Sequence, residues 1–200
     1  MLVKELRELH APAPSFGVFG AELTIYRLPR AIDAARMFAN RGLLLEVRPI
    51  LRLCLEMLSW ANVAFHMDDE DKVVSLKAQS CISALKPIYA TAGTLYGYLS
   101  RFTHWGHVIH THFLNFDSEQ VSVITASPRY RAMSLALCLV ILDVLVEVVR
   151  SMYGDRSDSL TLAVQGAVGR DTGRQTYKFL EKIAALTELD DIREIRSLLV

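Results

Sequence analysis

Cysteine is scarce in this chain: its 200 residues include three, Cys54, Cys81 and Cys138, each within an apolar stretch. An odd number of well-separated cysteines argues against a disulfide framework and is typical of reduced core cysteines in a cytosolic protein. Excess charge is lacking too, because 22 basic residues balance 22 acidic ones. With 52% apolar residues, this balance excludes a disordered chain and a binder that depends on a charged tail.

Long apolar runs are also missing. The first ten residues carry four charges, and no uninterrupted apolar segment of the kind found in secretory signals follows them. The most apolar stretch, Met133–Val149, contains Asp143 and Glu147 and falls short of the roughly 20 residues that a membrane-spanning helix needs. We therefore expect this stretch to be a buried central helix and the protein to be cytoplasmic, with no membrane span.

Common nucleotide-binding and hydrolase motifs are absent. The sequence has no Walker-type loop, no G-x-G-x-x-G, no H-E-x-x-H and no G-x-S-x-G. Nucleotide-binding folds and serine or zinc hydrolases therefore have no support from motifs. No fixed-period repeat is visible either, which argues against a solenoid.

The apolar residues that are present recur mostly at helical spacing, so the sequence predicts an all-α protein. We expect a mostly antiparallel helical bundle with a small β-hairpin insertion near 109–125. The predicted organisation has an N-terminal arm at 1–20, the bundle with its hairpin at 21–154 and a C-terminal helical appendage at 155–200. The hairpin is predicted because 109–116 and 121–125 are rich in β-branched and aromatic residues and are separated by four polar ones.

Proline, glycine and capping residues set the expected helix boundaries. Pro29 is expected in the first turn of a helix, and Pro49 is expected to kink or restart the chain before a helix that ends near His66. A long bent helix is expected from Asp71 to Ser100. The strongest prediction is a helix that Ser127 caps, Pro128 begins and Gly154 ends. Two short helices are expected at the C-terminus, over 173–186 and 188–199.

Polar aromatic residues gather between Tyr96 and His112, where the sequence reads YGYLSRFTHWGHVIHTH. This segment holds four of the six histidines together with Arg101. Imidazole moves protons near neutral pH, and a guanidinium holds phosphate oxygens. The combination suits phosphoryl chemistry on RNA, in which a histidine takes the proton of a 2′-hydroxyl and arginine stabilises charge on phosphorus.

The spacing within this segment resembles a known family. Arg101-Phe-Thr-His-Trp-Gly-His107 fits the R-x(4–6)-H pattern of HEPN (higher eukaryotes and prokaryotes nucleotide-binding) helical domains. The resemblance implies a metal-independent ribonuclease without a cofactor, with a composite site at a homodimer interface. It also implies a role as a toxin or phage-defence effector, with an antitoxin or defence protein as partner.

Two further motifs look like bacterial HEPN-related proteins of unassigned or abortive-infection type. These are Arg52-x3-Glu56 on one predicted helix and Leu99-Ser100-x3-His104 on another. In that group a short β-hairpin typically follows the second helix, as predicted here. The resemblance covers roughly residues 25–153 and leaves both ends of the chain unaccounted for.

These motifs assign roles to named side chains. Arg101 is expected to stabilise phosphate charge, and His104 or His107 to act as general acid and base. A supporting shell is expected around them, formed by Ser100, Arg52, Glu56 and Tyr96. Arg52 and Glu56 can instead form a simple ion pair within one helix. Near the start of the 128–153 helix, Arg129 and Arg131 are predicted to bind phosphate, or else are merely exposed to solvent.

Two other functions remain open. In the first, the histidine-rich segment is architectural, and the protein is a non-catalytic interaction module whose 128–153 and C-terminal helices contact a second copy or a partner. In the second, His104, His107, His110 and His112 bind zinc or iron. Structural zinc usually has four ligands that include cysteine, and no cysteine lies within this segment, so no metal site is assigned.

Overall fold

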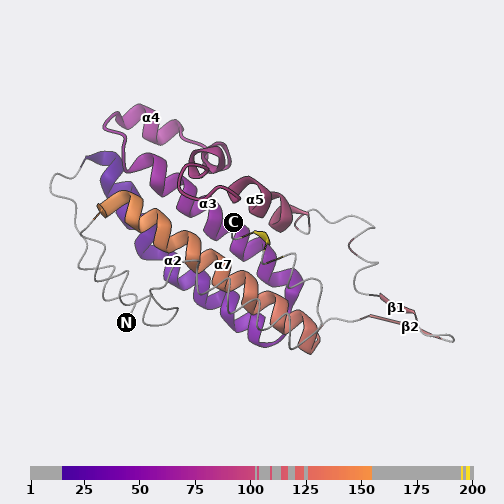
Figure 1. Ribbon diagram of the computed structural model, residues 1–200. Coiled ribbons are helices and arrows are strands. Elements are labelled where there is room, and N and C mark those ends of the chain that lie inside the picture. Colours follow the sequence, from indigo (N-terminus) through magenta and orange to yellow (C-terminus); the bar gives the residue numbers. More distant parts are fainter. Residues whose placement is uncertain are drawn as a thin grey trace.

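Three long helices dominate the protein, which we describe from a computed structural model (Figure 1). The described residues are 15–101, 103, 109, 114–116, 120–123, 126–154, 195, 197 and 198. The long helices are α2 (Phe16–Asn40), α3 (Leu44–Ala64) and α7 (Pro128–Tyr153). Shorter elements complete the described chain: α4 (Glu70–Ser75), the 3₁₀ helix η1 (Ala78–Leu85), α5 (Ala92–Ser100), β1 (Leu114–Phe116) and β2 (Val121–Val123). The predicted all-α class is confirmed.

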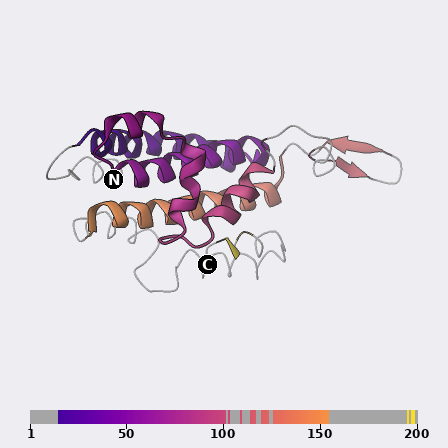
Figure 2. The same cartoon turned by 90° about the horizontal axis from the view of Figure 1, so that it is seen from above.

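The long helices α2, α3 and α7 pack against one another, and η1 and α5 cover the side of α3 away from α2 (Figures 1 and 2). The end of α5, the beginning of α7 and the hairpin lie at one end of the bundle, whereas α4 lies at the other. The two strands are antiparallel, with Leu114 opposite Val123 and Phe116 opposite Val121. The predicted hairpin is therefore confirmed in its described part, although Ile109 is helical and buried rather than part of a strand.

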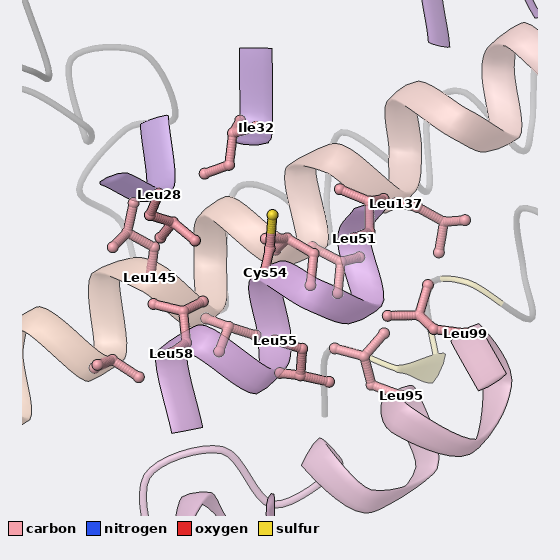
Figure 3. Packing of buried hydrophobic residues seen from close by; sticks show 14 of the residues in the cluster. Leu28, Ile32, Leu51, Cys54, Leu55, Leu58, Leu95, Leu99, Leu137 and Leu145 are labelled. Carbon is pink, nitrogen blue, oxygen red and sulfur yellow. The ribbon is translucent and has the colours of Figure 1, made fainter. Parts of the chain in front are cut away.

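The core lies where these helices meet (Figure 3). Fully or almost fully buried residues include Leu28 of α2, Leu51 and Leu55 of α3, Leu95 of α5 and Leu145 of α7. Each buried leucine contributes about 1.5–3 kcal/mol relative to an exposed one. The segment that carries the candidate site, α5, is thus held on α3 by the same hydrophobic core as the long helices.

The long helix α7 begins and ends as predicted. The Ser127 hydroxyl accepts a hydrogen bond from the Tyr130 N–H at 3.1 Å, Pro128 is the first residue, and Gly154 follows the last turn with a φ of 55°. By length and composition α7 could cross a membrane, and among the described helices it is the one that could. It packs against both α2 and α3, and 61% of its most apolar 18-residue window is buried inside the protein.

Two predictions about the first helix are wrong. Residues 16–20, assigned to the N-terminal arm, form the first turn of α2, because the Ser15 hydroxyl caps the Val18 N–H at 3.3 Å. Pro29 lies in the middle of α2 rather than in a first turn. A proline inside a helix costs about 3 kcal/mol. Burial of Leu28 and Ile32 on either side of Pro29 offsets this cost and keeps the helix continuous.

The predicted restart at Pro49 is also wrong, because α3 runs without a break from Leu44 through Pro49. The turn between α2 and α3 instead centres on Gly42, whose φ is +72°. A Cβ atom at this position would lie 2.8 Å from the carbonyl oxygen of Ser127. Only glycine allows this conformation without strain, and its missing side chain lets the turn approach the start of α7.

The single helix expected from Asp71 to Ser100 is broken into α4, η1 and α5. Side chains of α3 replace the helical bonds at the first break. The Trp60 indole N–H donates to the Leu76 carbonyl at 3.2 Å, and the Ser59 hydroxyl donates to the Ala78 carbonyl at 3.2 Å. These contacts satisfy backbone groups that would otherwise be buried without partners, so the chain can turn here.

The two helices predicted over 173–186 and 188–199 lie outside the described residues, apart from 195, 197 and 198. Ile195 is fully buried and Leu198 is 2% exposed, and both belong to the hydrophobic core. The Thr91 hydroxyl, just before α5, donates a hydrogen bond to the Leu198 carbonyl. The end of the chain therefore packs against the helix that carries the candidate site.

Candidate functional site

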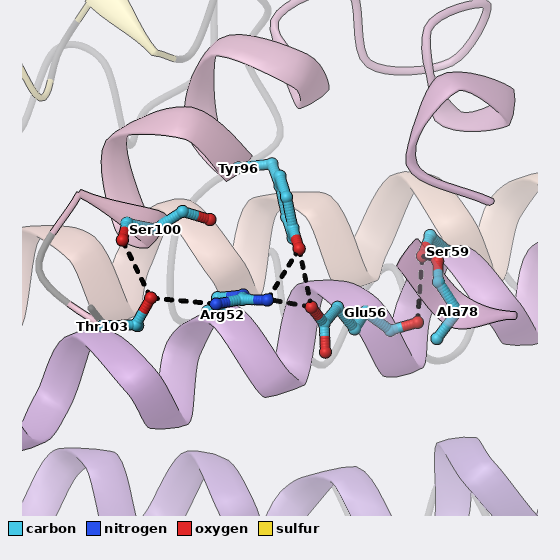
Figure 4. A network of polar contacts seen from close by, with 7 residues as sticks. All are labelled: Arg52, Glu56, Ser59, Ala78, Tyr96, Ser100 and Thr103. Atoms are coloured by element: carbon cyan, nitrogen blue, oxygen red, sulfur yellow. Dashed lines mark hydrogen bonds and ion pairs between the residues drawn. The ribbon is translucent and has the colours of Figure 1, made fainter. Parts of the chain in front are cut away.

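A network of polar side chains joins α3 to α5 (Figure 4). Arg52 and Glu56 lie one turn apart on α3, and Tyr96 faces them from α5. The Arg52 Nε donates to Glu56 Oε1 at 3.1 Å, and its Nη2 donates to the Tyr96 phenol oxygen at 2.8 Å. The Tyr96 hydroxyl donates in turn to Glu56 Oε1 at 2.9 Å. Each of the three side chains therefore bonds to the other two.

The same arginine also holds the segment that leaves α5. Its Nη1 donates to Thr103 Oγ1 at 2.9 Å, and the Thr103 hydroxyl donates to the Ser100 carbonyl oxygen at 2.8 Å. The Ser100 hydroxyl itself is buried, and within the described part of the chain no group bonds to it. Arg52 thus fixes the first residues after α5, where the predicted catalytic histidines follow.

Partial burial makes the network more than a surface ion pair. The side chains of Arg52 and Glu56 are 23% and 20% exposed, so water reaches them only in part. The guanidinium carbon of Arg52 also lies 5.1 Å from the centre of the Tyr96 ring, within the range of a cation–π contact. Of the two alternatives open from the sequence, the intrahelical ion pair forms, and it forms as part of the wider network.

A second arginine–tyrosine contact lies beside the first. Arg48 of α3 is 3% exposed, and its Nη2 donates to the Tyr98 phenol oxygen at 3.1 Å. The guanidinium carbons of Arg48 and Arg101 lie 5.0 Å and 5.8 Å from the centre of the Tyr98 ring. Arg101 is exposed directly after α5. A buried and an exposed guanidinium therefore share one tyrosine, which orients the exposed one.

The predicted site residues divide into three groups. The structure brings together Arg52, Glu56 and Tyr96, and Thr103 links them to Ser100. It places Arg101 on the neighbouring tyrosine rather than in this network. The remaining candidates lie outside the described residues: His104, His107, His110 and His112. A meeting of Arg101 with an imidazole therefore stays a prediction.

The two predicted phosphate-binding residues, Arg129 and Arg131, are exposed in the first turn of α7. The α2–α3 turn approaches them, since a Cβ on Gly42 would lie 3.5 Å from the Arg131 amide nitrogen. This approach brings the exposed Arg41 to the same end of the bundle. The positive end of the α7 dipole adds to the arginine charges, so this end favours anions. Among the described residues at this end, the exposed acid Glu46 near the start of α3 opposes them.

Sequence reasoning missed Thr103, Arg48 and Tyr98. Thr103 has a signal, because Tyr96, Ser100 and Thr103 are spaced four and three residues apart, as on one helical face. Arg48 was obscured by Pro49, which the structure shows inside the helix. For Tyr98 no local signal distinguishes it from Tyr96: both phenols accept a hydrogen bond from an arginine of α3, and the two differ in burial and in which arginine they meet.

Metal ligands do not gather in the described part of the chain: no three His, Cys, Asp or Glu side chains come together there to hold an ion. Buried cysteines are also unsuited to this role, because burial raises the pKa of Cys54 and Cys138 to about 12.

Compared with protein-family models, with curated proteins and with solved structures, the chain matches none.

Proposed function

We propose that this protein is a HEPN-like endoribonuclease that cleaves RNA without a metal ion. The observation that carries the proposal is the bond from Arg52 to Thr103, which ties the segment after α5 to α3. Arg101 precedes this anchored residue, and His104 follows it. Catalytic groups must be held within a fraction of an ångström of their working position, and a fixed backbone on rigid helices supplies such support.

The proposed reaction is an internal transfer at a phosphodiester. A histidine, His104 or His107, takes the proton from a ribose 2′-hydroxyl, and the bond from O2′ to phosphorus forms. The bond from phosphorus to O5′ breaks, and an imidazolium returns a proton to the leaving oxygen. Arg101 stabilises the charge that develops on the phosphoryl oxygens. The products are a 2′,3′-cyclic phosphate and a 5′-hydroxyl end.

Charge separation along the bundle supports binding of RNA at this end. Arg41, Arg101, Arg129 and Arg131 are exposed where α5 ends and α7 begins, and the acidic run 68–71 is exposed at the opposite end (Figure 1). A chain with zero net charge binds RNA weakly as a whole, but such a separation directs the phosphates to the basic end. We propose that Arg129 and Arg131 contact phosphates flanking the cleaved one.

The test is cleavage of a labelled single-stranded RNA in buffer containing EDTA. We expect the unmodified protein to produce cyclic-phosphate ends, and Arg101→Ala to lower the rate by at least about 100-fold. Arg36→Ala is the matched control, because Arg36 is an exposed arginine on α2 that pairs with Asp33. Equal cleavage by the parent and by Arg101→Ala, or no cleavage by either, would overturn the proposal.

Two further variants, His104→Ala and His107→Ala, address the non-catalytic alternative. If the histidine-rich segment is architectural, His104→Ala will lower the melting temperature strongly, and no variant will cleave RNA. If the segment is catalytic, His104→Ala or His107→Ala will keep the parent melting temperature within a few degrees and lose activity. The comparison separates a folding defect from a chemical one.

A further inference from the structure

One face of α2 is apolar and exposed to solvent. Phe16, Phe19, Leu23 and Tyr26 follow one another at intervals of three, four and three residues, and they are 45%, 61%, 49% and 39% exposed. We call these four residues the α2 stripe. The buried residues of the same helix, among them Ala21, Ile25 and Leu28, lie on the opposite side. The alternating spacing is that of a coiled-coil seam without its partner helix.

The acidic run lies at the N-terminal end of this stripe. The Ser15 hydroxyl, at the start of α2, donates to the Met67 carbonyl at 3.3 Å, and α4 packs against α2. Residues 68–71 are all acidic and exposed, and Lys72 is the one basic residue beside them. At the other end the stripe is followed by Arg27 and Arg30, which are also exposed. Along the axis of α2 the exposed groups therefore run from the acidic residues at its start, through the stripe, to Arg27 and Arg30, and the exposed Asp33 follows them.

When a second copy of α2 runs in the opposite direction, the acidic end of each copy meets the basic end of the other. We propose that α2 binds α2 of a second copy in an antiparallel pair, with the two-fold axis near residue 21. Phe16 then faces the partner's Tyr26, and Phe19 faces the partner's Leu23. At 1.5 Å per residue, Arg30 lies about 13 Å from the axis and Phe16 about 7 Å. The partner's Arg30 thus extends past the start of α2 to the acidic run. The two-fold axis repeats this contact, so that each copy's Arg30 meets the other copy's acidic run.

The surface area that the α2 pair would bury sets the expected affinity of the dimer. Three half-exposed aromatic side chains and one leucine bury about 400 Å² per copy, taking about 200 Å² for a whole aromatic side chain. A standard interface buries about 800 Å² per partner, so the acidic and basic ends must supply the remainder. We expect a dimer that dissociates in the micromolar range and weakens with added salt. Zero net charge on each copy leaves no overall repulsion to oppose it.

This arrangement differs from a composite site. The α2 stripe points away from the core, and α5 lies across the bundle from α2 (Figure 2). Each copy would therefore keep its own Arg52 network facing outward. The inference does not depend on the proposed ribonuclease activity, and its test needs no RNA.

The test is the mass of the full chain by light scattering and sedimentation, over a concentration series that reaches about 100 μM. We expect a monomer–dimer equilibrium, which Phe19→Glu abolishes without changing the circular dichroism spectrum. Val121→Glu is the control, since Val121 is 62% exposed but belongs to the hairpin. A parent that stays monomeric throughout, or a Phe19→Glu variant that dimerises like the parent, would overturn the proposal.

Charge reversal tests the antiparallel pairing. We expect Arg30→Glu to weaken the dimer at least about tenfold, and addition of Asp68→Arg to the same chain to restore much of the affinity. Both residues are exposed, so neither change disturbs the core. A double variant no tighter than Arg30→Glu alone would refute the antiparallel pairing.

Discussion

Removal of the Tyr96 hydroxyl measures how strongly the polar network holds α5 on α3. In Tyr96→Phe the ring remains, while the bonds to Arg52 at 2.8 Å and to Glu56 at 2.9 Å are lost. A hydrogen bond to a charged group contributes about 1.5–3 kcal/mol. The charged partners are about one-fifth exposed, so water can replace part of what is lost. We therefore expect the free energy of unfolding to fall by about 1–2 kcal/mol.

Urea denaturation followed by circular dichroism is the appropriate assay. With a slope of about 2 kcal/mol per molar urea, the expected loss lowers the midpoint by about 0.5–1 M. The slope itself should not change, because the same surface is exposed on unfolding. Glu56→Gln keeps the shape of the side chain and removes its charge, so it completes a double-mutant cycle. We expect a coupling energy of at least about 0.5 kcal/mol between residues in direct contact.

Two results would refute this reasoning. A Tyr96→Phe midpoint that equals the parent's would mean that water satisfies Arg52 and Glu56 as well as the phenol does. Strict additivity of Tyr96→Phe and Glu56→Gln would mean that the two side chains do not interact in solution. Either outcome would leave the bond from Arg52 to Thr103 as the contact that positions the segment after α5.

Three further changes have defined outcomes. Gly42→Ala should lower the unfolding free energy by about 1–3 kcal/mol, measured by denaturation, because a Cβ at φ +72° would press on Ser127; a neutral effect would contradict the tight turn. Burial raises the pKa of Cys54 and Cys138 to about 12, so both thiols should resist thiol reagents at pH 8 in the native state. The free energy of unfolding should also fall as the pH rises from 9 toward 12, because these thiols ionise in the unfolded chain before they ionise in the folded one. Rapid labelling of both cysteines in the folded protein would show that their burial is wrong. The N–H groups of α4 lower the pKa of Asp69 below its usual value of 3.8. The charged carboxylate therefore stabilises the fold above pH 3.8, and this contribution is lost as the pH falls below that value. Asp69→Asn should flatten the acid side of the plot of stability against pH, and identical plots for the two proteins would argue against the cap.

The α2 stripe changes where an interface is expected. From sequence, the 128–153 helix and the C-terminal helices were the candidates for contact with another copy or a partner in a non-catalytic module, and the C-terminal helices lie largely outside the described residues. In the structure most of the apolar residues of α7 are core, and the exposed apolar residues that share one helical face are on α2 instead. Periodicity identifies an apolar face, but it does not tell whether that face meets the same chain or a second one. Whether the same chain covers an apolar face depends on how many of its own helices pack around that helix.

The sequence by itself determined the fold class, the α7 helix and the position of the hairpin. These features follow from signals confined to a few neighbouring residues. Ser127, Pro128 and Gly154 fix the ends of α7 through local backbone chemistry, and alternation of β-branched and aromatic residues marks the strands. The spacing of Arg52 and Glu56 likewise guarantees that they share a face of whatever helix contains them.

Tertiary structure decided what these local signals leave open. Whether Pro29 and Pro49 break a helix depends on the burial of their neighbours, because packing energy of several kcal/mol offsets the lost hydrogen bond. That α3 side chains bind the carbonyls of Leu76 and Ala78 could not be foreseen from either segment alone. Two partners of Arg52, Tyr96 and Thr103, are 44 and 51 residues away along the chain. Only the docking of α5 on α3 brings them within hydrogen-bonding distance.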